Sequence, residues 1–126
     1  MRRLALPLVL LLPLLALPSS ASASKVRCDI GYYAPGLDHG QPRVSKLRAI
    51  DLPRRTDGYA PRCLVAEAVA SEVKRAIQDT GERPARVRVF GARWSGGRWN
   101  CAYADATTTC RKAGKPSRKV KFRLGG

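Results

Sequence analysis

A single histidine is the chain's most direct candidate for acid–base chemistry. His39 follows Asp38 in the loop sequence LDHGQP, and a neighbouring carboxylate can orient an imidazole as a general base. No nucleophile accompanies it in a triad pattern, and the chain has no second histidine for the pairs that cleave phosphodiesters. We therefore interpret His39 as a polar loop residue. A small hydrolase that uses it is the weakest of three functional hypotheses.

The carboxylates offer no better catalytic set. Glycoside hydrolysis requires two facing carboxyl groups. Glu67 and Glu72 fall in a helical pattern, where we expect both on the solvent side near Arg75, and Asp105 falls in a predicted turn. The sequence thus predicts a non-enzymatic protein with no catalytic residues and no cofactor.

Four cysteines, by contrast, indicate a structural role. An even set in an exported chain predicts two disulfides. Metal binding would call for a Cys-x-x-Cys spacing or clustered histidines, and the sequence has neither. The residues concerned are Cys28, Cys63, Cys101 and Cys110.

The first 23 residues have the three parts of a secretory signal. Arg2 and Arg3 precede an apolar run over residues 4–17, and an Ala-x-Ala site ends at Ala23, where we expect cleavage. The run is shorter than the ~20 residues that span a bilayer, and prolines interrupt it. We therefore expect residues 24–126 to form one secreted, extracellular domain without a membrane span.

Hydrophobic periodicity predicts one helix and several strands. Between Pro61 and Gly81, apolar residues recur every three or four positions and leave Glu67 and Lys74 on the opposite side. Period-two alternation marks strands near residues 26–32, 86–89, 99–103 and 120–124, and residues 44–52 look extended though less regular. This pattern predicts an α+β fold in which the helix packs on an antiparallel sheet of about four to five strands.

Register arithmetic suggests how the cysteines pair. A hairpin centred between Asp105 and Ala106 places Cys101 opposite Cys110, at a separation that suits a disulfide. Elimination then pairs Cys28 with Cys63, although a bridge between Cys63 and Cys101 stays possible because both point inward. The same alternation places Trp99 on the dry face, as an aromatic cover for a small core.

Positive charge is the strongest functional signal. The chain carries +15, or +13 without Arg2 and Arg3, and from residue 86 onward eleven Lys or Arg accompany a single acid. Either these charges only solvate the outer face and block edge aggregation, or they bind an anionic partner. Candidate partners are a cell-wall polymer, nucleic acid, anionic lipid or an acidic protein, and the lack of interleaved aromatics argues against sequence-specific nucleic-acid recognition. If the strands form one sheet, the predicted anion-binding surface comprises Arg86, Arg88, Arg98, Lys119, Lys121 and Arg123.

Several motifs together resemble small secreted proteins of actinobacteria. They are the signal peptide, the helix CLVAEAVA (63–70), the strand GGRWNC (96–101), the later Cys110 and the final KVKFRL (119–124). The resemblance implies an extracytoplasmic α+β domain and carries no catalytic residues. The segment around Cys28 departs from the commonest version.

A looser likeness, in architecture alone, is to the protease inhibitors secreted by streptomycetes. It supplies the alternative function, a secreted inhibitor of a protease or other hydrolase. The loop at 33–43 or the loop at 52–61 would enter the hydrolase cleft.

Overall fold

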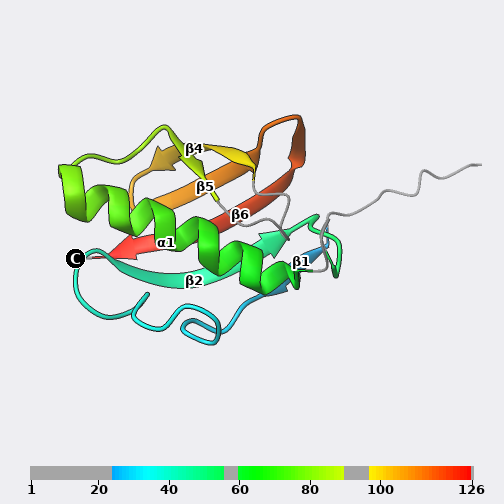
Figure 1. Cartoon of the computed structure of the whole chain (residues 1–126), viewed down its shortest axis with the longest axis horizontal. Coiled ribbons are helices and arrows are strands. Elements are labelled where there is room, and N and C mark those ends of the chain that lie inside the picture. Colours follow the sequence, from blue (N-terminus) through cyan, green and yellow to red (C-terminus); the bar gives the residue numbers. More distant parts are fainter. Residues whose placement is uncertain (1–23, 56–59, 90–96, 126) are drawn as a thin grey trace, which may run out of the picture.

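Strands and one helix form two layers in the computed structural model, which describes residues 24–55, 60–89 and 97–125 (Figure 1). Within those ranges, six strands make one antiparallel sheet in the order β1-β2-β6-β5-β4-β3. Its members are β1 (Lys25–Arg27), β2 (Arg43–Ile50), β3 (Arg86–Arg88), β4 (Arg98–Ala104), β5 (Thr107–Lys112) and β6 (Lys115–Gly125). The predicted α+β fold is confirmed, with six strands where about four to five were expected.

Helix α1 (Arg62–Thr80) covers one face of this sheet. Its apolar stripe is buried, with Val69 and Val73 fully inaccessible to solvent, because the stripe packs on the sheet. The helix ends where predicted, since Gly81 adopts a left-handed φ of 78° and its N–H donates to the Ile77 carbonyl at 2.7 Å. Pro61 stands just before the first helical residue and not inside the first turn.

The hairpin between β4 and β5 has the predicted register. Cys101 pairs with Cys110 across the strands, as Tyr103 does with Thr108. The two cysteines form a disulfide, and Cys28 forms the other with Cys63, which ties the segment after β1 to the helix. The alternative bridge between Cys63 and Cys101 is wrong.

The less regular alternation in β2 has a structural cause. Ser45 pairs with Arg123 and Arg48 with Lys121, so the two residues Lys46 and Leu47 stand opposite a single residue of β6. This β-bulge shifts the alternation by one position. Leu47 consequently points into the core and is fully buried, while Lys46 is exposed at a φ of 53°.

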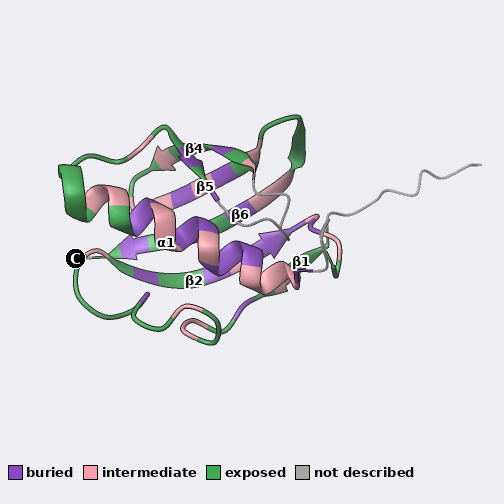
Figure 2. Cartoon of the chain, viewed as in Figure 1, coloured by how far each residue is buried: buried purple, intermediate pink, exposed green. Residues whose placement is uncertain are grey.

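The remaining strands follow the predicted division into a dry face and a wet face. Along the C-terminal half of β6, Val120, Phe122 and Leu124 are buried and alternate with exposed Lys121 and Arg123 (Figure 2). Trp99 is 2% exposed and belongs to the core, as predicted.

Membrane-spanning candidates are lacking in this part of the protein, since no described helix is both long and apolar enough. The predicted signal peptide lies outside the described residues, as do residues 56–59 of the second proposed inhibitory loop.

Candidate anion-binding surface

The face of the sheet opposite α1 is lined with cations. In antiparallel pairs, residues directly opposite each other point to the same face. One row across the sheet joins Arg27 of β1, Arg48 of β2 and Lys121 of β6. A parallel row joins Lys119 of β6 to Arg111 of β5. We call this side of the sheet the outer face.

The six residues predicted for an anion-binding surface all lie on the outer face, in two groups. Lys119, Lys121 and Arg123 occupy the central strand β6, whereas Arg88 pairs with Arg98 at the β3 edge and Arg86 pairs with Asn100. Arg111 and Asn100 share one row and link the two groups.

Sequence reasoning missed several cations of this face. Arg27 and Arg48 belong to it because β1 and β2 join the sheet beside β6. Alternation in the first strand already placed Arg27 outward, but the bulge at Lys46 hides Arg48 from any period-two count. The alternation in the sequence therefore indicates the outward position of Arg27 but not that of Arg48.

Acidic side chains are absent from the strands. None of the strand residues within the described ranges is Asp or Glu. Asp51 directly follows β2, and Asp105 occupies the turn between β4 and β5. The outer face therefore carries its positive charge without carboxylates from the strands to neutralise it.

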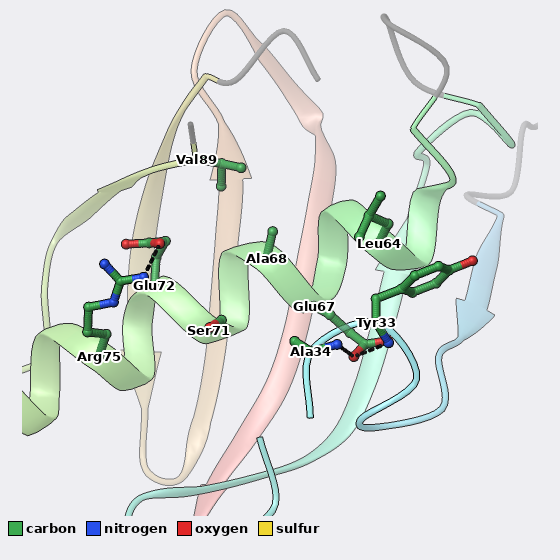
Figure 3. Close-up of a pocket in the computed structure, with 9 residues that line it drawn as sticks. All are labelled: Tyr33, Ala34, Leu64, Glu67, Ala68, Ser71, Glu72, Arg75 and Val89. Atoms are coloured by element: carbon green, nitrogen blue, oxygen red, sulfur yellow. Dashed lines mark hydrogen bonds and ion pairs between the residues drawn. The ribbon is translucent and has the colours of Figure 1, made fainter. Parts of the chain in front are cut away.

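The helix side differs from the prediction at two residues. Glu67 was expected on the solvent side of the helix, but it is fully buried. Its carboxylate accepts hydrogen bonds from the backbone N–H of Ala34 at 2.8 Å and of Tyr33 at 3.1 and 3.2 Å (Figure 3). The loop over residues 31–42 covers this side of the helix, and the buried carboxylate satisfies backbone donors that would otherwise lack partners.

Lys74 lies about two turns further along the same face of the helix and binds the same loop with a positive charge. It is 7% exposed, and its ammonium group donates to the carbonyls of Gly36 at 2.8 Å, Leu37 at 3.0 Å and His39. Desolvation lowers the pKa of Lys74, and the charge of Asp38 opposes this shift. The expectation that Lys74 faces solvent is therefore wrong.

Glu72 behaves as predicted. Its carboxylate pairs with the Arg75 guanidinium at 3.2 Å, on the exposed side of the helix (Figure 3). The pair lies at one end of a shallow hollow of about 320 Å³, whose other lining includes Tyr33, Leu64 and Ala68. Glu67 also contributes to this lining, but its carboxylate oxygens are occupied by the loop backbone.

His39 sits on this loop in open solvent. Its Nε2 is 3.4 Å from the Asp38 carboxylate, and the side chains are 81% and 55% exposed. A solvated pair of this kind lacks the burial by which active sites tune a catalytic base. Metal binding has no better candidate, since the described residues contain no group of three or more possible ligands.

The loop also bears on the inhibitor alternative. Peptides that enter clefts by strand addition present extended backbone. Here the backbone runs through successive bends, and its N–H and carbonyl groups are directed towards Glu67 and Lys74. The exposed aromatics Tyr32 and Tyr33 pack edge to face with centroids 4.7 Å apart.

Comparison with protein-family models, with curated proteins and with solved structures finds no match to this chain.

Proposed function

We propose that the protein is exported and acts as a non-enzymatic binding protein for an anionic polymer outside the cytoplasm, through the outer face of its sheet. The observation that carries the proposal is the register, which gathers cations from β1, β2, β5 and β6 on one face whose strands contain no acid. Two disulfides are compatible with an extracellular location.

The outer face suits a polyanion better than a compact acidic partner. Cations at every second position of β6 repeat at about 6.6 Å along the strand, so the face presents a row of charges and not a point. Ion pairs involving Glu72 and Asp38 lie on the helix side, away from this row. A flexible polymer can follow such a row, and its released counterions favour binding at low salt.

Among the described residues, no aromatic side chain on this face offers a platform for base stacking. Trp99 and Phe122 are buried in the core, and the Tyr103 hydroxyl donates to the Pro84 carbonyl at 2.5 Å on the helix side. Proteins that bind single-stranded nucleic acids combine a basic groove with exposed aromatics. Electrostatic attraction to a polymer backbone is therefore the mode of binding that we propose.

Charge reversal on β6 tests the proposal. Retention of residues 24–126 on bacterial cell walls and on a polyanion resin is measured over a salt series, for the wild type and for K119E/K121E/R123E. The matched control is R62E/R75E/R83E, which changes the net charge equally on the helix side of the sheet.

We expect the β6 variant to elute at much lower salt than the wild type, and the control to shift less. Circular dichroism verifies that both variants fold. Equal shifts for the two variants would mean that only net charge matters, and the proposed surface would then be wrong. If the protein instead captures acidic proteins in preference to polymers, the proposed partner class, an anionic polymer, is wrong.

A further inference from the structure

The outer face is not flat at the β2 bulge. Lys46 and Leu47 together oppose Phe122, and the extra residue bends the strand. A hollow of about 230 Å³ opens beside it. Its lining consists of Lys25, Lys46, Arg48, Thr107, Lys121, Phe122 and Arg123.

Five of these seven residues are cations and none is an acid. The Arg48 guanidinium donates to the Lys46 carbonyl at 3.2 Å, which holds it over the bulge. Thr107 lies in the same cross-strand row as Arg123, so its hydroxyl belongs to the outer face. The hollow thus combines converging charges with a neutral hydrogen-bond donor.

We propose that this hollow binds a terminal or monoester phosphate group of a phosphate-bearing polymer; the inference rests on the proposed function and names its ligand. A carboxylate has two oxygens and one charge, which a single arginine can satisfy. A monoester or terminal phosphate presents three acceptor oxygens and a charge of roughly −1.5 to −2, and arginine and lysine are its usual partners. A site where Arg48, Lys46 and Lys121 converge therefore suits phosphate chemistry better than carboxylate chemistry.

The backbone at Lys46 supports a role for its side chain. Lys46 has a φ of 53°, in the left-handed region that Gly, Asn and Asp adopt more readily. The other non-glycine residues described with positive φ are Asp51 and Asp105, which belong to the tolerant types. Of these three residues, Lys46 is therefore the type least suited to a left-handed backbone, and strain of this kind often marks a functional position.

A polymer fits this site better than a membrane headgroup. Proteins that bind bilayers through a surface insert apolar side chains beside their cations. The exposed large hydrophobics within the described residues are Tyr32 and Tyr33, on the loop that Glu67 holds against the helix. The described part of the outer face would therefore contact a bilayer through charge and not through inserted apolar side chains.

Calorimetric titration of residues 24–126 tests the assignment with four probes at fixed ionic strength. They are inorganic pyrophosphate, linear polyphosphate, polyglutamate of similar length and vesicles of phosphatidic acid in phosphatidylcholine. The variants are R48Q and K46N, since Asn keeps the left-handed backbone at position 46 accessible. R62Q removes an arginine on the helix side of the sheet, outside the proposed binding surface, and is the matched control.

We expect polyphosphate to bind more tightly than polyglutamate and than the vesicles. R48Q and K46N should each weaken pyrophosphate and polyphosphate binding about tenfold, the usual worth of a charge-assisted contact, and R62Q by less than about twofold. Amide resonances of residues 46 and 107 should shift on titration with pyrophosphate.

Two outcomes overturn the hollow as a phosphate site. Equal losses in R48Q and R62Q would show that the protein binds only through its net charge, and equal binding of polyglutamate would remove the preference for phosphate. If the vesicles bind more tightly than polyphosphate, the phosphate group that the hollow binds belongs to a lipid and not to a polymer. The proposed function fails separately, if the β6 reversal and its helix-side control behave alike on the polyanion resin.

Discussion

Truncation of Glu67 to alanine should destabilise the protein far more than truncation of Glu72, although the two residues share one helix. The Glu67 carboxylate is fully buried and accepts hydrogen bonds from two backbone N–H groups of the loop. Glu72 makes an ion pair with Arg75 on the helix surface, where the Arg75 side chain is 64% and the Glu72 side chain 26% exposed. The comparison isolates the effect of burial and bonding from that of charge.

The magnitude follows from the groups left behind. In E67A the N–H groups of Tyr33 and Ala34 lose a charged acceptor, and an unsatisfied donor costs about 1–3 kcal/mol. Both donors are only partly buried, so water can reach them and we expect a total of about 2–4 kcal/mol. For a domain of this size, each kcal/mol lowers Tm by roughly 4–8 °C. E72A should cost no more than about 0.5 kcal/mol, as exposed helical pairs do.

Thermal unfolding by circular dichroism measures both variants under the same conditions, and hydrogen exchange locates the effect. Amide protection should fall at Tyr33 and Ala34 in E67A while it persists in β5 and β6. E67Q keeps the side-chain volume and should lie between the two alanine variants. If E67A and E72A lower Tm equally, the buried carboxylate does not hold the loop and the reasoning is refuted.

Further predictions concern the cross-links and one tyrosine. In the chain-entropy account, C28S/C63S opens a loop with a separation of 35 residues and should lower the free energy of unfolding by about 4 kcal/mol. C101S/C110S opens a loop with a separation of 9 and should lower it by about 2.5 kcal/mol. Urea unfolding measures both losses. A larger loss for the hairpin bridge would contradict this order. Burial raises the pKa of Tyr103 to about 12, so ultraviolet titration should show one late-ionising tyrosine that Y103F removes. The unfolded chain ionises this group near its ordinary pKa of 10.0. The free energy of unfolding of the wild type should therefore decrease as the pH rises from 10.0 to about 12, and Y103F should lack this decrease.

Several parts of the fold could be predicted because they depend on neighbours in the chain. The alternation around Val120 and Phe122, the apolar stripe of α1 and the register that opposes Cys101 with Cys110 are local patterns. Each repeats with the period of its own element. The outward position of Lys121 and Arg123 follows from the same alternation.

Other parts of the candidate site could not be read locally. The bulge at Lys46 depends on how β2 meets β6, and that pairing joins segments separated by most of the chain. The bulge decides that Arg48 shares a row with Lys121, and it opens the hollow beside them. A period-two count carries no information about an inserted residue until the partner strand is known.

By itself the sequence determined the main elements, the register that opposes Cys101 with Cys110 and the sign of the outer face, because side-chain periodicity follows from backbone geometry within each element. Tertiary structure alone decided the fate of Glu67 and Lys74. Both look like solvent-side helix residues, and both are buried because a distant loop presents backbone N–H and carbonyl groups to them. Every residue type except proline offers both groups, so the sequence does not mark which loop will supply them.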